Sequence, residues 1–372
     1  MVLFNCEKRS DKCILQGAEV TKLQEIFKRI LISDYFVLYL IFVYIAIIYP
    51  FAPLIVSPLN LSDVFSNMWP LFIIALGQCV VLITAGIDLS QIAVISFSSI
   101  LAGILLTTSV VDPSVFEHYP IWNILVDQSG GILSQGDLYM IFAIFIIIAI
   151  SAIIGTINGI SVAYFKIPPF IATLITQMFI SALALWMTKS DSLASLPDNF
   201  YNISEYEIFE MGSFVISSSF IVGIGVGLII WYILKYTLLG AHLFAVGTNM
   251  KTAKVSGINT TKVIIIAYVI SSICAAIGAI LYSSRLEIGR PSLGNFSMLM
   301  DIIGANVIAG VSLFGGRGKV SLTLFGVIFF ILLANSLSLI GVEFYVNEVI
   351  KGGAIAFAAT IDVFRMRYMN KA

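Results

Sequence analysis

Few residues of this 372-residue chain are of types that do chemistry, and they lie far apart along the sequence. His118 and His242 are the only histidines, and neither has a partner at a metal-ligand spacing. No Ser-His-Asp or paired-carboxylate arrangement stands out. The segment 315–319 is not a phosphate-binding loop, because Val320 follows its lysine and no glycine lies five residues before Gly318. We therefore predict no catalytic residue, no metal and no bound cofactor in this chain.

Uncharged polar side chains interrupt the long apolar runs, and amides and hydroxyls suit a neutral ligand rich in hydroxyl groups. Hydrogen bonds between packed helices would explain each of these side chains equally well. Together with one aromatic residue and two carboxylates, they form our candidate lining for a solute path: Gln78, Asp88, Asn158, Phe170, Thr173, Asp301, Asn306 and Asn335.

The two carboxylates of this set have different surroundings in the sequence. Asp88 falls in a short gap between two apolar runs, where we interpret it as the N-cap of the second run, with a gate at the cytoplasmic mouth as the alternative. Asp301 lies just inside an apolar run. An unpaired carboxylate in lipid costs at least ~2.5 kcal/mol. We therefore expect Asp301 to line the path or to pair with Arg285 or Arg290.

The composition of the chain predicts that these residues are held within a membrane domain. Apolar residues make up 59% of the chain and charged residues only 11%. A soluble core of this size would need far more charge to cover its surface. The apolar runs are too long for the short alternating strands of a β-barrel. We predict an all-α polytopic membrane protein, and the formal net charge of −1 gives no reason to expect a nucleic-acid partner.

Ten apolar runs are long enough to be considered as spans. With the N-terminus inside, 16 Lys and Arg residues lie on the cytoplasmic side and 4 outside, as the positive-inside rule requires. We therefore predict a cytoplasmic segment 1–34, a transmembrane domain 35–365 and a cytoplasmic tail 366–372. The predicted spans are 35–56, 66–86, 91–111, 138–165, 168–188, 213–234, 262–284, 298–313, 320–340 and 348–364.

Three loops stand out between these spans. The outside loops 112–137 and 189–212 are either docking surfaces or solvated connections. The cytoplasmic loop 235–262 carries four of the chain's twenty Lys and Arg residues. Within this loop, Thr248 or Asn249 can cap a short helix that Gly257 ends. A short capped helix between two spans is the kind of element that docks onto a partner.

The pattern of this loop resembles the coupling loop of bacterial sugar permeases, the ribose- and galactoside-type membrane subunits of ATP-binding-cassette importers. The residues that carry the resemblance are Gly247, Asn249, Ala253, Ser256, Gly257, Ile258 and Asn259. Other segments resemble that family in the same order along the chain: 84–90, Gly155 with Asn158-Gly159, 167–174, Asp301 with 310–318, and Lys351-Gly352 with Asp362. The pattern departs at Leu299, where the family has Glu, and at Asn306.

The resemblance implies a permease subunit in the bacterial inner membrane, with domain 35–365 as the permease. Its partners would be ATPase subunits that use ATP, a periplasmic or lipid-anchored solute-binding protein, a second identical or paralogous permease, and membrane lipid. The implied solute is small and neutral, a monosaccharide first. The sequence leaves open two other solutes, a nucleoside and a signalling furanose. It also leaves open a different class of protein, an ion-coupled secondary transporter.

Overall fold

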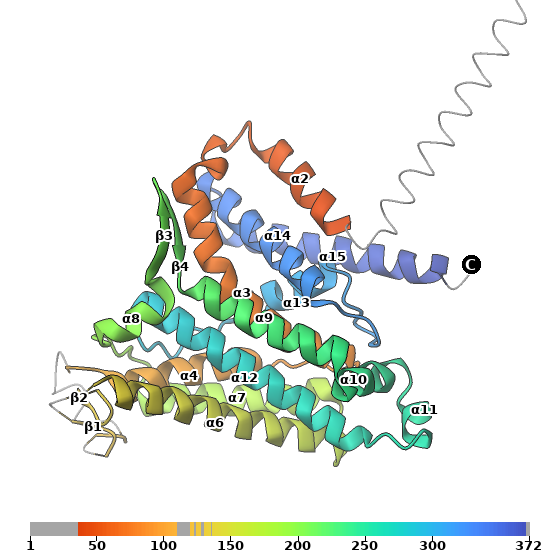
Figure 1. Cartoon of the computed structure of the whole chain (residues 1–372), viewed down its shortest axis with the longest axis horizontal. Helices are drawn as coiled ribbons and strands as arrows, with labels where there is room; N and C mark the ends of the chain where they lie inside the picture. Colours follow the sequence, from red (N-terminus) through yellow and green to blue (C-terminus); the bar gives the residue numbers. More distant parts are fainter. Residues whose placement is uncertain (1–35, 110–119, 123, 128–129, 135, 370–372) are drawn as a thin grey trace, which may run out of the picture.

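The computed structural model describes residues 36–109, 120–122, 124–127, 130–134 and 136–369. The predicted segment 1–34 and the end of the predicted tail, residues 370–372, lie outside the described residues. The described chain is built of helices with two small antiparallel hairpins (Figure 1). The prediction of an all-α polytopic architecture is therefore confirmed at the level of a mostly helical chain with several apolar helices.

The helices are α2 (Phe36–Ile48), η1 (Pro53–Val56), α3 (Pro58–Ile83), α4 (Gln91–Leu106), α6 (Asp137–Ala163), α7 (Pro169–Met187), α8 (Asp198–Glu205), α9 (Ser219–Tyr236), α10 (Leu238–Thr248), α11 (Met250–Val255), α12 (Thr260–Leu286), α13 (Phe296–Ile308), α14 (Val320–Leu339) and α15 (Phe344–Met369). The hairpins are β1 (Val126–Asp127) with β2 (Gly130–Gly131), and β3 (Glu207–Met211) with β4 (Phe214–Ser217).

Each of the ten predicted spans coincides with a helix, but the helices differ in length and polarity. Among the described residues, six are long and apolar enough to cross a membrane alone: α3, α6, α7, α9, α12 and α14. The helices α2, α4, α10 and α13 are apolar but shorter. The total of ten spans and the cytoplasmic location of both termini therefore stay predictions.

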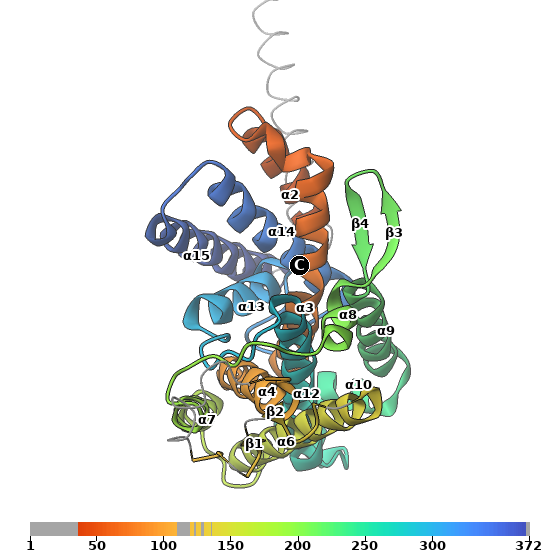
Figure 2. The ribbon, with the colours of Figure 1, turned by 90° about the vertical axis from the view of Figure 1, so that its left-hand side faces the viewer.

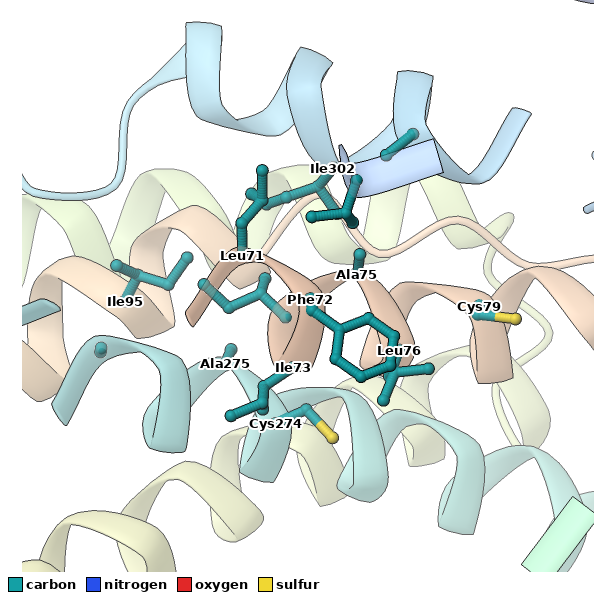
Figure 3. Packing of buried hydrophobic residues seen from close by; sticks show 14 of the residues in the cluster. Leu71, Phe72, Ile73, Ala75, Leu76, Cys79, Ile95, Cys274, Ala275 and Ile302 are labelled. Carbon is teal, nitrogen blue, oxygen red and sulfur yellow. The ribbon is translucent and has the colours of Figure 1, made fainter. Parts of the chain in front are cut away.

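Helix α3 runs through the centre of the molecule, because from Met68 onward it is apolar on nearly every face. Its side chains are almost all buried from Met68 to its end. It packs against α9, α12, α13 and α14. Figure 3 shows Leu71 and Leu76 of α3 among Cys274 of α12 and Ile302 of α13. In lipid the hydrophobic effect does not drive contacts between helices, so close van der Waals packing must hold these helices together.

Glycines bring α12 close to both of its main neighbours. A Cβ atom at Gly155 or Gly159 of α6 would lie 2.6 Å from backbone atoms of α12. A Cβ atom at Gly278 of α12 would overlap the side chain of Ile74 in α3. Small residues at these three positions therefore fix α6, α12 and α3 as one packed unit.

The two ends of the helix bundle carry different structures (Figures 1 and 2). The hairpins β1–β2 and β3–β4 lie with α8 at one end, and α11 lies at the other. The residues of the second predicted outside loop form α8 and β3. The predicted start of the following span at residue 213 is wrong, because Phe214–Ser217 form β4 and the helix α9 begins only at Ser219. This arrangement separates the predicted outside loops from the loop 235–262.

Candidate functional site

Within the loop 235–262, α11 is the short capped helix that the sequence predicts, whereas the longer helix α10 before it was not predicted. The Asn249 side chain accepts a hydrogen bond from the Thr252 N–H at 3.1 Å and caps α11. Gly257 has φ +83°, a left-handed conformation that glycine adopts without strain. The Ile258 N–H donates to the Ala253 carbonyl at 3.1 Å, which closes the end of the helix.

The residues that hold this helix in shape differ from those that it presents outward. Ala253 is only 4% exposed and faces the body of the chain. Val255 is 90% exposed and Met250 is 48% exposed. The resemblance picks out Ala253 and the capping residues because they set the geometry of the loop. It missed the two exposed apolar side chains of α11, whose signal in the sequence is an apolar residue within the otherwise polar segment 248–257.

Three backbone segments meet at what we call the backbone junction, formed by Gly247 of α10, Ile83 of α3 and Gly316. The Gly316 N–H donates to the Ile83 carbonyl at 2.9 Å. A Cβ atom at residue 247 would overlap that same carbonyl oxygen and lie 2.7 Å from the Gly316 nitrogen. Only glycine fits at position 247. The end of α10, two residues before α11, therefore rests directly on the end of α3.

Residues 84–90, which we call the linker, turn the chain from α3 into α4. Ala85 adopts φ +62°, which is uncommon for a residue with a side chain. A Cβ atom at Gly315 would lie 2.8 Å from the Ala85 Cβ, so the turn beside the backbone junction also presses on the linker. The predicted break between the second and third spans is confirmed as this linker.

Asp88 lies in the linker, fully buried, and both of its carboxylate oxygens accept hydrogen bonds. Its Oδ1 accepts from the Ser90 backbone N–H at 3.0 Å and from the Ser90 hydroxyl at 2.6 Å. Its Oδ2 accepts from the Ser271 hydroxyl of α12 at 2.6 Å. Three donors therefore converge on one carboxylate and favour its ionised form, but burial is the larger effect and raises the pKa of Asp88 above its ordinary value.

Two further chains of hydrogen bonds end at these serines. The Asn158 amide of α6 donates to Ser90 Oγ at 2.8 Å, and its carbonyl oxygen accepts from Thr176 of α7 at 2.6 Å. The Gln91 amide of α4 donates to Ser271 Oγ at 2.9 Å. We call this group the Asp88 network. It joins the linker to α4, α6, α7 and α12.

The interpretation of Asp88 as the N-cap of α4 is wrong. The N-cap of that helix is Ser90, and its side chain makes no capping hydrogen bond. Asp88 bonds no N–H group of the first helical turn, because its oxygens reach only Ser90 and Ser271. The carboxylate bonds α12 across the fold instead of capping α4.

Of the other predicted path residues, Thr173 contacts the linker, because its hydroxyl lies 3.4 Å from the Ile87 carbonyl, whereas Asn306 and Asn335 lie elsewhere. Asn306 of α13 is fully buried and donates to the Ala75 carbonyl of α3 at 2.9 Å. The Asn335 side chain of α14 exchanges two hydrogen bonds with that of Asn60, at 2.9 and 3.0 Å. Thr173 is buried and donates to the Pro169 carbonyl of its own helix at 2.8 Å. These contacts explain how the residues are held and leave their part in transport a prediction.

Gln78 and Phe170 show the two extremes of burial within the predicted set. Gln78 of α3 is fully buried, and neither atom of its amide has a hydrogen-bond partner. Phe170 of α7 is 54% exposed. A buried amide without a partner is uncommon in folded proteins, whereas an exposed Phe on an apolar helix can face lipid.

Asp301 pairs with a residue other than the two that the sequence suggests. Its Oδ2 lies 2.9 Å from the Lys351 Nζ of α15. Arg285 instead lies between Asp63 and Glu205, at 3.6 and 3.5 Å. The expected pairing of Asp301 with Arg285 or Arg290 is therefore replaced by an ion pair between α13 and α15.

Within the described residues, no group of three or more His, Cys, Asp or Glu side chains is placed to hold a metal ion. The arrangement is that of a transport subunit: apolar helices, a buried polar network and an external capped helix tied to the helix core. Residues 60–359 match the family described as branched-chain amino acid transport system, permease component, and the chain belongs to that family.

Curated relatives match nearly the whole chain. The galactose/methyl galactoside import permease protein of Haemophilus influenzae is 31% identical over 91% of this chain and 94% of its own length. The ribose import permease protein of Bacillus subtilis is 32% identical over 87% of this chain and 90% of its own length. The galactose/methyl galactoside import permease protein of Escherichia coli is 30% identical over 86% and 90%. No solved structure matches the chain.

These matches confirm the predicted resemblance to ribose- and galactoside-type permeases. The chain is the permease component of an ATP-binding-cassette importer and is an inner-membrane protein. Permeases of this family generally work with separate ATPase and solute-binding subunits, so the hydrolysis of ATP belongs to another chain.

Proposed function

We propose that this permease carries a small neutral solute, a monosaccharide first, and that α11 is where the ATPase subunit docks. Relatives named for galactose and ribose support the choice of solute. The observation that carries the docking assignment is the exposed pair Met250 and Val255, on a helix whose preceding element touches the end of α3 at the backbone junction. An apolar pair exposed on a cytoplasmic loop is typical of a protein interface.

The mechanism that we propose passes movement from α11 through the backbone junction to the linker. A shift of α10 presses Gly247 against Ile83, because no side chain separates the two backbones. The linker next to Ile83 carries Asp88, whose network reaches α4, α6, α7 and α12. Closure of the ATPase dimer would in this way reorient several helices together, as alternating access requires.

The assembly that we propose has two copies of the permease, identical or paralogous, around a central path in the lipid bilayer. ATPase subunits dock at the end that carries α11, and a periplasmic or lipid-anchored solute-binding protein docks at the end that carries the hairpins. We propose ten spans within 35–365 and cytoplasmic termini, in support of which ten helices coincide with the predicted spans. Among the predicted path residues, Phe170, Asp301 and Asn335 are the ones with exposed surface.

The test of ATPase docking is the substitution Val255→Glu. A carboxylate at the centre of an apolar contact is costly to bury, so we expect at least a fivefold loss of ATPase subunit recovered with the tagged permease, on the order of 1 kcal/mol or more. The melting temperature of the isolated permease should stay unchanged, because the side chain is 90% exposed.

The matched control is Met211→Glu in the hairpin β3–β4, where the side chain is 66% exposed at the opposite end of the bundle (Figure 1). This variant should retain the ATPase. Equal recovery of ATPase with Val255→Glu and with the wild type would remove α11 as the docking element.

A further inference from the structure

A cluster of charged and polar side chains joins α13 to α15, and the proposed mechanism does not use it. Lys351 lies at its centre with its side chain 7% exposed. Its Nζ is 2.9 Å from Asp301 Oδ2 and 3.4 Å from Glu348 Oε1. The Ser297 hydroxyl donates to the same Glu348 oxygen at 2.7 Å. We call these four residues the α13–α15 charge cluster.

Two acceptor atoms beside Lys351 have no donor. The Oδ1 atom of Asp301 is buried and accepts no hydrogen bond, although Oδ2 of the same carboxylate is held by Lys351. The Oδ1 atom of Asn347 is also buried without a partner. Asn347 precedes Lys351 by four residues, so the two side chains share one face of α15. A buried acceptor without a donor is costly and uncommon in folded proteins, so a ligand that brings donors is favoured here.

The cluster is open enough to meet a solute. The Asp301 side chain is 19% exposed and that of Glu348 is 28% exposed. Next to Lys351, Gly352 is exposed, and a Cβ atom there would meet nothing within 4 Å. The two carboxylate side chains of the cluster therefore reach the surface beside an unfilled position of α15, and the unpartnered Oδ1 atoms of Asp301 and Asn347 lie beneath that surface.

We propose that Asp301 and Asn347 accept hydrogen bonds from the hydroxyl groups of the solute as it passes. Lys351 holds the Asp301 carboxylate in place for this purpose. Two carboxylates against one ammonium leave the cluster with a formal charge of −1, so it repels anionic solutes and admits neutral polyols. This assignment rests on the proposed function, because it takes the solute to be a sugar.

The experiment reconstitutes the whole complex, with its ATPase and solute-binding subunits, in proteoliposomes. It measures uptake of labelled D-ribose or D-galactose together with ATP hydrolysis. With Asp301→Asn, an amide N–H₂ replaces the free acceptor while the carbonyl can still meet Lys351. We expect about a tenfold loss of sugar taken up per ATP hydrolysed, with ATP hydrolysis within about twofold of the wild type. Asn347→Leu should give a loss of the same kind, without touching the ion pair.

The matched control for a purely structural ion pair is Asp301→Lys combined with Lys351→Asp. This double variant restores opposite charges across α13 and α15 but moves the acceptor away from its place. Sugar uptake should stay low. Recovery of uptake in the double variant, or wild-type uptake with Asn347→Leu, would overturn the solute site and leave the proposed function intact. A wild-type complex that assembles and imports neither sugar would instead overturn the choice of solute, and this site with it.

Discussion

Replacing Gly247 by Ala should abolish solute uptake. The added Cβ would overlap the Ile83 carbonyl oxygen and crowd the Gly316 nitrogen, so α10 must move away from α3. Overpacking between two backbones costs about 3 kcal/mol, because no flexible side chain can give way. That cost corresponds to roughly a hundredfold decrease in the equilibrium constant for forming the native backbone junction. Uptake in membrane vesicles, normalised to the amount of permease, is the measurement that checks this expectation.

The control for this variant is Gly225→Ala in α9. That glycine also lies within a helix, but a Cβ there would meet nothing within 4 Å. Alanine is the better helix former by about 1 kcal/mol, so this variant should be neutral or slightly stabilising. Normal uptake by Gly247→Ala would show that the backbone junction does not carry movement from α10 to α3.

The second large effect is expected for Asp88→Asn. The carboxylate accepts three hydrogen bonds in a fully buried position. An amide of the same shape offers a donor where Ser90 or Ser271 already donates, and Ser271 also accepts from Gln91. At least one buried hydroxyl therefore loses its acceptor, and a charge-assisted bond is lost with it. We expect a loss of about 3 kcal/mol in the free energy of unfolding.

This loss should appear as a lower melting temperature of the permease in mild detergent. Glu210→Gln in the exposed strand β3 changes the same kind of group and should leave the melting temperature unchanged. If Asp88→Asn and the wild type have the same melting temperature, the donors and acceptors assigned to the Asp88 network are wrong, and the carboxylate is protonated in the folded chain.

The helix α11 could be predicted from sequence because the signals that define it are local. Asn249 and Gly257 lie at its two ends, and each acts on a backbone group within a few residues. Apolar length likewise predicted a helix for each proposed span. That the Val255 side chain faces outward and Ala253 faces the body of the chain could not be predicted, because it depends on how α10 and α12 pack.

The Asp88 network could not be predicted because its partners are distant in sequence. Ser271 follows Asp88 by 183 residues, and Asn158 follows Ser90 by 68. Many serines and amides in the sequence are possible partners of Asp88, and nothing in the sequence favours one over another. A local N-cap was therefore the simplest interpretation of Asp88. The same holds for Asp301, whose partner Lys351 lies 50 residues away while Arg285 and Arg290 are nearer along the chain.

The most direct test that the ATPase subunit docks on α11 is a cross-link from position 255. Val255→Cys would be introduced into a permease whose four native cysteines are replaced by serine or alanine, and the intact complex would be treated with a short thiol-to-amine cross-linker in native membranes. We predict that mass spectrometry identifies an ATPase subunit cross-linked to residue 255. The yield of this cross-link should change when a non-hydrolysable ATP analogue is added. If no ATPase is cross-linked from this position, and the chain still moves sugar when only an ion gradient is supplied, α11 is not an ATPase-docking element and the chain does not depend on ATPase subunits.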